Sequence, residues 1–195
     1  MKNSFFAMLS RMKLISRWGL MRNSMPENIA EHSFDTALLA HALAVIKNKR
    51  FGGNVDAGRV VMLALYHDAP EIFTGDMPTP VKYFNPSIRN EYKQVEKASL
   101  LKLLSYLPDD LRGDYEDVMV PKPEDKELLR IVKAADKLSA LIKCIEEEKA
   151  GSREFKKAAA AQEKTLKEMN MPEVDCFMTE FLPAFSLTID ELESE

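Results

Sequence analysis

Residues 60–76, VVMLALYHDAPEIFTGD, place ionisable side chains directly behind the longest apolar run of the chain. That run, with Asp56 in front of it as a favourable N-cap, predicts one helix extending through the quoted stretch. On this helix His67 and Glu71 lie on one line, and Asp68 lies on the adjoining line. Three ionisable groups buried in a helix would cost several kcal/mol without a partner, so the pattern predicts a compensating charge.

Pro70 interrupts the same predicted helix, which continues towards Gly75. Proline lacks the N–H that a helix interior needs, so we expect a kink beside the ionisable residues. The next segment, GDMPTPVKYFNPS at residues 75–87, contains three prolines and is predicted to be a loop.

Helical periodicity covers most of the remaining chain, and no stretch alternates convincingly at the period of a strand. The sequence therefore predicts an all-α fold, a compact helical bundle forming a single domain over residues 1–195. The expected helical segments are 5–15, Glu27–Lys49, Ile88–Tyr106, Lys126–Lys149, Phe155–Met169 and Pro172–Phe185, with an acidic connection at Pro108–Asp125.

Composition excludes several classes of protein. The chain has 27 Lys and Arg against 31 Asp and Glu, and this slight acidity argues against binding to a nucleic acid polymer. Its longest apolar stretch is far shorter than the ~20 residues that span a bilayer. Cys144 and Cys176 fit no metal-binding spacing and suggest a reducing compartment. We therefore expect a soluble, cytoplasmic protein with no membrane partner.

Two other predicted helices also place an ionisable group against apolar residues. His32 shares a line with Leu43, and Asp136 lies at the edge of a broad apolar face. A divalent cation would compensate all of these groups at once. Two imidazoles and two carboxylates, His32, His67, Asp68 and Asp136, form a credible mixed ligand set drawn from three helices.

Each of these residues also has a purely structural interpretation. His41 lies nine residues after His32, close to the opposite side of the helix, and we expect it to be a hydrogen-bonded core histidine. The two acids could instead pair with lysines, Asp136 with Lys133 or Lys143. The spacing of the whole set favours the metal site.

Longer strings narrow the interpretation. The order His, His-Asp, Asp resembles the HD-domain metal phosphohydrolases, and the strings resemble the bacterial 5′-deoxynucleotidase branch of that superfamily. The resemblance extends to about Glu148 and is weaker through FMTEFLPAFSL at 177–187. The strings are SRWGLMRN (16–23), ENIAEHSFDTALLAHALA (27–44), LALYHDAPEIFTGDMPTPVKYFN (63–85) and VKAADKLSALIKCIEE (132–147).

The resemblance implies hydrolysis of deoxyribonucleoside 5′-monophosphates, a divalent metal such as cobalt or manganese, and a homodimer. Because His41 points away from the other histidines, we expect one metal ion per site. The family's residues carry over as follows: metal ligands His32, His67, Asp68 and Asp136; catalytic Glu71 and Arg17; substrate contacts Arg17, Trp18, His32, Asp68, Asp76, Met77, Pro78, Thr79 and Asp136.

The chemistry of these residues suits a phosphate monoester. The first 26 residues contain five basic residues and no acid, and Arg17 among them offers a planar fork for phosphate oxygens. Glu71 would act as general base or would orient the attacking water, and Trp18 would exclude a 2′-hydroxyl. The structural alternatives are a partner for a ligand histidine at Glu71, a core side chain at Trp18, and a proline-stiffened connector at 76–79.

Two wider alternatives remain at this point. The N-terminal segment could be a basic amphipathic helix that lies on a membrane surface. The whole chain could be another HD-type nucleotide phosphohydrolase, or a helical module that binds nucleotides without turnover.

Overall fold

The computed structural model describes residues 3–82 and 84–194, without the side chain of Thr79. Within these residues the regular elements are helices, and the one β-type pairing is an isolated bridge between Ser16 and Asn28. The all-α prediction is confirmed. The elements are α1 Phe5–Leu9, η1 Ser10–Leu14, α2 Ile29–Arg50, α3 Ala57–Tyr66, α4 Glu71–Thr74, α5 Thr79–Lys82, α6 Pro86–Leu104, α7 Asp109–Met119, η2 Pro123–Asp125, α8 Lys126–Lys149, α9 Lys156–Glu168, α10 Pro172–Glu180, η3 Leu182–Ser186 and α11 Ile189–Leu192.

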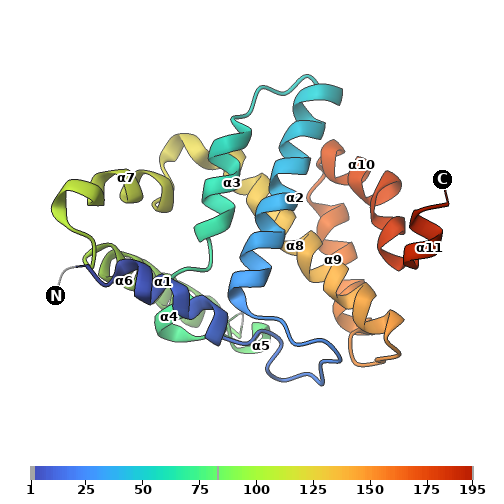
Figure 1. Ribbon diagram of the computed structural model, residues 1–195, viewed down its shortest axis with the longest axis horizontal. Coiled ribbons are helices and arrows are strands. Elements are labelled where there is room, and N and C mark those ends of the chain that lie inside the picture. Colours follow the sequence, from blue (N-terminus) through green and yellow to red (C-terminus); the bar gives the residue numbers. More distant parts are fainter. Residues whose placement is uncertain (1–2, 83, 195) are drawn as a thin grey trace.

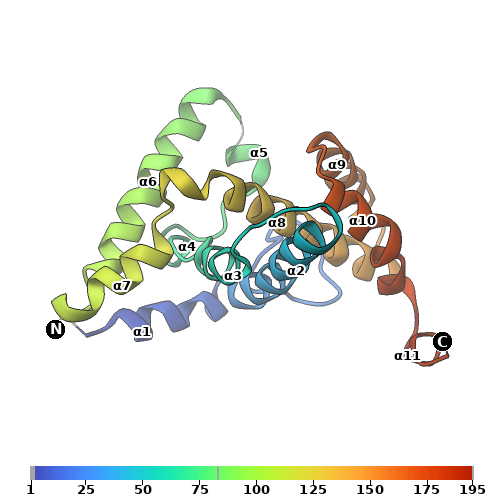
Figure 2. The same cartoon turned by 90° about the horizontal axis from the view of Figure 1, so that it is seen from above.

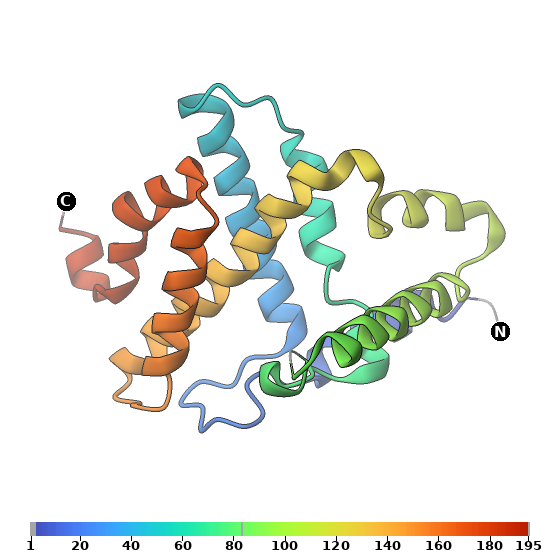
Figure 3. The same ribbon diagram turned by 180° about the vertical axis from the view of Figure 1, so that it is seen from behind.

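The centre of the fold is a packed trio of helices, α2, α3 and α8. Figure 1 shows α2 and α3 side by side, and Figure 3 shows α8 crossing them from the other side. Their apolar faces meet in a core that contains the fully buried Leu43 and Leu138. Helices α9 and α10 cover the outer side of α8 and α2.

A second apolar cluster lies between α1, α6 and α7, on the opposite flank of the central trio (Figure 2). Phe5 is almost fully buried there and meets the ring of Tyr115 edge-on, with 4.9 Å between ring centroids. Met12 is buried in the same cluster. Phe5 and Met12 of the N-terminal segment therefore pack on the protein, as in an ordinary helix that covers a core.

The chain bends sharply where the sequence predicts only a kink. Helix α3 ends at Tyr66, whose carbonyl accepts a hydrogen bond from Ala69 N at 3.1 Å. Pro70 has no N–H to continue the helical ladder, and its ring would clash with the Tyr66 carbonyl. The prediction of one helix through to Gly75 is therefore wrong: a tight turn separates α3 from α4.

Two predicted loops contain helices. The acidic segment 108–125 forms α7 and η2, because Asp109 and Asp110 stabilise a helix N-terminus and Met119 is buried at its other end. In the proline-rich segment 75–87, residues 79–82 form the single turn α5. Prolines are tolerated at the start of a helix. The prediction of a loop treated them only as helix breakers and is wrong for residues 79–82.

One face of α2 is more exposed than predicted. His41 is exposed rather than buried in the core, so its interpretation as a core histidine is wrong. Phe34 and Leu38 on the same face are 58% and 55% exposed. Apolar residues on that face made the helix look buried on all sides, although α3, α8 and α10 cover only part of its circumference. Among the described residues, no helix is long and apolar enough to cross a membrane.

Candidate functional site

The predicted ligands lie where the two apolar clusters meet. Ala64 belongs to the central core and Ala69 to the flanking cluster, and His67 and Asp68 lie between them in the turn after α3. His32 lies in α2 between residues of the same two clusters. The junction of two separately packed cores holds these polar groups without breaking either core.

His32 is fully buried, and both ring nitrogens are engaged. Nδ1 lies 3.0 Å from Ser139 Oγ on α8, while Nε2 lies 3.3 Å from Asp136 Oδ1 and 3.6 Å from Asp68 Oδ2. Burial lowers the pKa of His32 despite the hydrogen bond with Asp136. A neutral imidazole, the form that binds a metal, is therefore favoured.

His67 points its free nitrogen to the same place. Its Nδ1 lies 2.7 Å from the carbonyl oxygen of Ala64, which can only accept, so this nitrogen carries the proton. Nε2 lies 3.2 Å from Asp68 Oδ2 but forms no hydrogen bond within the described part of the chain. Burial alone would lower the pKa of His67, but the charge of Asp68 raises it to about 9.

Three of the four predicted ligands offer atoms that all lie within 4.8 Å of one another: His32, His67 and Asp68. The fourth, Asp136, reaches His32 from α8, and its Oδ2 accepts a hydrogen bond from Lys137 at 2.9 Å. Burial would raise the pKa of Asp136, but the hydrogen bond from His32 and the charge of Lys137 hold it well below its usual range. Asp136 pairs with Lys137 rather than with either lysine considered from the sequence.

The donor set fits a divalent cation. Among the described residues Nε2 of His67 is buried without a hydrogen-bond partner, 3.2 Å from Asp68 Oδ2. The pKa values of Asp68 and Asp136 are both lowered, so both carboxyls are ionised. Two imidazoles with carboxylates suit several transition metals, including zinc, manganese and cobalt. His32, His67 and Asp68 are the residues that could hold the ion, with Asp136 beside them.

Glu71 is the first residue of α4 and follows the turn that contains His67 and Asp68. Its side chain is buried, and Oε2 has no hydrogen-bond partner among the described residues. Burial and the charges of Asp68 and Asp76 raise the pKa of Glu71 to about 9. A carboxylate with a high pKa is a strong base for a carboxylate, and a nearby cation would favour its ionised form.

Arg17 and Trp18 lie in the loop that joins η1 to α2. Arg17 is largely buried, and its charge influences the pKa values of both His32 and Asp76. The Trp18 ring packs against Phe155, with 5.3 Å between ring centroids, and remains partly exposed. Both predicted substrate residues therefore lie at the edge of the ligand cluster.

The segment 76–79 approaches the same edge. It follows Gly75, whose φ of 70° and ψ of 169° suit glycine alone. Burial raises the pKa of Asp76, while the charge of Arg17 and the backbone of Trp18 oppose this rise, so the Asp76 carboxyl lies near the loop of Arg17. Met77 and Pro78 are half-buried, and the side chain of Thr79 lies outside the described part of the structure.

Two residues of the site were missed at the level of sequence. Glu27 contacts Arg17 and Trp18 through one carboxylate oxygen, and Ser139 contacts His32. The only available signals were that Glu27 is the first acid after a basic segment and that Ser139 lies three residues after Asp136 on one helix. Neither signal identifies the partner: His32 and Ser139 lie on separate helices, and the Glu27 contact depends on how the loop between η1 and α2 folds back on itself.

Comparison with known proteins now decides the family. Residues 4–185 match the family described as 5′-deoxynucleotidase YfbR-like. The chain belongs to the YfbR-like family. It is 53% identical over 188 residues to a 5′-deoxynucleotidase of Photorhabdus temperata, covering 96% of this chain and 95% of the relative. It is 51% identical to a 5′-deoxynucleotidase of Pectobacterium atrosepticum, covering 100% of this chain and 98% of the relative.

Solved structures share the fold of this YfbR-like chain. An HD-domain phosphohydrolase of Listeria innocua has a TM-score of 0.81 at 24% identity, covering 97% of this chain and 92% of that protein. A cyanophage S-2L HD phosphohydrolase, solved with dA and one catalytic Zn²⁺ ion, has a TM-score of 0.65 at 24% identity, covering 93% and 96%. These structures confirm the resemblance of the fold to HD-domain phosphohydrolases, and the family match confirms the resemblance to the 5′-deoxynucleotidase branch.

Proposed function

We propose that this protein is a metal-dependent 5′-deoxynucleotidase that hydrolyses deoxyribonucleoside 5′-monophosphates to deoxynucleosides and phosphate. The observation that carries the proposal is the convergence of His32, His67 and Asp68 within 4.8 Å, with the buried Glu71 three residues after Asp68 in sequence. The 5′-deoxynucleotidases that share half of its residues over nearly full length support the substrate class.

The proposed cofactor is one divalent cation per site. The residues that would hold it are His32, His67, Asp68 and Asp136. Such an ion would supply Lewis-acid activation of a phosphate oxygen and of water. Cobalt or manganese is our proposal for this chain, since the mixed imidazole and carboxylate set accepts either.

The chain's own residues would perform the rest of the reaction. Hydrolysis joins a water oxygen to phosphorus, breaks the bond to O5′, and delivers a proton to that oxygen. Glu71 would take the proton of the attacking water or would orient that water, and its burial close in sequence to His67 and Asp68 supports this role. Arg17, whose guanidinium uses only one Nη in its contact with Glu27, would orient the phosphate with its remaining donors.

Residues at the edge of the site would recognise the sugar. The Trp18 ring would fill the space that a ribose 2′-hydroxyl needs, and Asp76 would accept a hydrogen bond from the 3′-hydroxyl. Met77, Pro78 and Thr79 would complete the wall on that side, and His32, Asp68 and Asp136 would also lie against the substrate.

The proposal is tested by phosphate release from metal-stripped protein, with cobalt or manganese added back, on dAMP and AMP side by side. Metal-dependent release from dAMP with little from AMP is the expected result. Equal release would leave a nucleotidase without deoxy selectivity. No release from either substrate would overturn the proposal.

A Glu71→Gln variant separates an enzyme from a nucleotide-binding module. We expect it to bind dAMP but to lose phosphate release by at least about 100-fold, because general acid–base catalysis contributes about 10²–10⁴-fold. Full activity in that variant would refute the role of Glu71. Asp136→Ala is expected to lose both metal and turnover, and stoichiometric metal retained in it would refute the four-ligand set.

We further propose a single-domain homodimer in the cytoplasm. Leu38 of α2 and Phe185 of the C-terminal segment line one surface hollow, and Phe34 is exposed on the same helix as Leu38. These side chains would offer an apolar face to a second copy. Sedimentation analysis of Leu38→Lys, which is expected to be monomeric, tests the dimer. An unchanged dimer in that variant would place the interface elsewhere.

A further inference from the structure

Glu27 contacts both residues to which we assign substrate recognition, Arg17 for the phosphate and Trp18 for the sugar. Its Oε2 accepts hydrogen bonds from Arg17 Nη1 at 2.7 Å and from Trp18 Nε1 at 2.8 Å. The side chain is only 10% exposed, and its other oxygen lies 4.0 Å from Nδ1 of His32. A single carboxylate therefore joins the Arg17–Trp18 pair to the histidine of the ligand cluster.

Trp18 needs such a hold, because its backbone is strained. Its φ of 59° lies in the left-handed region, which is uncommon for a residue with a bulky side chain. Strained residues persist only where surrounding contacts over-determine them, and they concentrate at functional sites. The Trp18 carbonyl accepts from Met21 N at 2.9 Å and from Asn23 Nδ2 at 3.4 Å, while Phe155 packs against the ring.

The loop from 17 to 27 is also closed at its base by Glu27 itself. Arg17 N donates to the backbone oxygen of Glu27 at 2.9 Å, and the isolated bridge between Ser16 and Asn28 follows directly. Asn28 then caps α2, the helix that carries His32. The position of the indole is thereby linked to the ligand cluster through one residue.

The hydrogen bond to Glu27 also occupies the only hydrogen-bonding group of the Trp18 indole. Nε1–H is the only hydrogen-bond donor of a tryptophan side chain, and in this protein it is directed at Glu27. A ribose 2′-hydroxyl that reached the ring would meet an aromatic surface without a free donor. Burial of a hydroxyl without a hydrogen bond is unfavourable, and this is a stronger basis for selectivity than the loss of space alone.

We propose that Glu27 is a positioning residue that sets the selectivity for deoxyribose over ribose, by fixing the Trp18 ring and occupying its N–H. This inference rests on the proposed function, because it assigns the sugar contact to Trp18. Removal of the carboxylate would let the ring turn and would free its N–H for a 2′-hydroxyl, so both effects favour ribonucleotides.

The test compares Glu27→Ala and Glu27→Gln with wild type by the ratio of kcat/KM for dAMP to kcat/KM for AMP. We expect the ratio to fall about tenfold in Glu27→Ala, and less in Glu27→Gln, whose amide oxygen still accepts one hydrogen bond. The matched control is Glu154→Gln, which removes a carboxylate that contacts the same loop at Arg22 N, 2.8 Å away, and should leave the ratio unchanged.

A second measurement does not depend on activity. Trp18 is the only tryptophan, so the intrinsic fluorescence of the protein reports on this ring alone. We expect acrylamide quenching to rise and fluorescence anisotropy to fall in Glu27→Ala, and to stay at the wild-type values in Glu154→Gln. Unchanged quenching in a folded Glu27→Ala would show that Glu27 does not hold the ring and would overturn the inference.

The outcomes separate the two levels of the proposal. Wild-type protein that turns over dAMP and AMP equally would refute the proposed deoxy selectivity, and this inference with it. Wild type that prefers dAMP, combined with a dAMP-to-AMP ratio in Glu27→Ala within twofold of wild type, would refute the role of Glu27 and leave the proposed function standing. A fall in the ratio with increased quenching would support it.

Discussion

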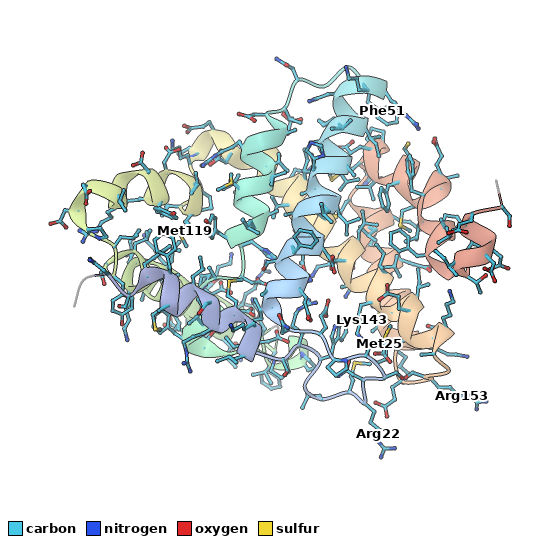
Figure 4. All side chains as sticks on the ribbon, in the orientation of Figure 1. Arg22, Met25, Phe51, Met119, Lys143 and Arg153 are labelled. Carbon is cyan, nitrogen blue, oxygen red and sulfur yellow. The ribbon has the colours of Figure 1, made fainter. Side chains whose placement is uncertain are left out.

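Lys143 and Glu147, one turn apart on α8, form an ion pair of 2.6 Å beneath the loop that carries Arg17 and Trp18. Both side chains are buried, and Glu147 accepts hydrogen bonds from Ser24 N and Met25 N at 2.8 and 3.0 Å. Figure 4 shows Lys143 beside Met25, whose carbonyl accepts from its Nζ. This pair holds the loop at Ser24 and Met25, whereas Glu27 closes the loop at its base.

Replacement of Glu147 by Gln should destabilise the protein by about 3 kcal/mol, because removal of one partner leaves Lys143 buried without its counter-charge. Urea unfolding measures the change. Glu148→Gln, an exposed neighbour on the same helix, should change the free energy of unfolding by less than about 0.5 kcal/mol. A Glu147→Gln variant as stable as this control would show that the pair does not stabilise the fold.

The same residue predicts a pH dependence. Burial would raise the pKa of Glu147, but the hydrogen bonds from Lys143 and from the backbone of Met25 and Ser24 lower it to about 2, from an ordinary value of 4.5. A carboxyl with a depressed pKa contributes stability above its unfolded value, and this contribution is lost as pH falls through the folded value. The stability gap between wild type and Glu147→Gln should therefore be widest above pH 4.5 and shrink towards pH 2. Unfolding curves at several pH values measure the gap, and a constant gap would contradict the assignment.

Ser139→Ala should weaken metal binding about tenfold without removing a ligand. The hydroxyl lies 3.0 Å from Nδ1 of His32, and loss of a group that orients a ligand histidine costs about 10–100-fold in affinity. Calorimetric titration with cobalt measures the change. Ser33→Ala is the matched control, because Ser33 is equally buried and its hydroxyl has no hydrogen-bond partner. Equal metal affinity in the two variants would refute a role for Ser139.

Gly75→Ala should raise KM for the nucleotide and cost about 1–3 kcal/mol of stability, because the backbone at this position is compatible only with glycine. Strain there would displace Asp76 and Met77, which follow directly. Gly113→Ala, in exposed α7 with no atom near the added methyl, should instead stabilise the protein by about 0.5–1 kcal/mol. Steady-state kinetics and unfolding curves measure both effects, and a KM unchanged by Gly75→Ala would separate this turn from the substrate site.

Periodicity was sufficient for the long helices. The predicted segment 126–149 matches α8, and the N-cap predicted at Asp56 accepts from Arg59 N at 2.9 Å. These features depend on residues three or four apart, so they are local in sequence. The sequence did not predict a helix in the acidic segment 108–125, because few residues of α7 are apolar. This helix packs through Met119, which is buried in the flanking cluster.

The sequence by itself determined the helical class, the types of ligand and their order along the chain, because residue chemistry and helical spacing are local properties. Only the tertiary structure decided which nitrogen of His67 is free, that Lys137 pairs with Asp136, and that Glu27 holds both Arg17 and Trp18. All three features depend on hydrogen bonds, which require donor and acceptor at specific distances and angles. Packing of α2 against α8 brings His32 to Ser139, and the closure of one loop brings Glu27 to Arg17 and Trp18; helical periodicity encodes neither contact.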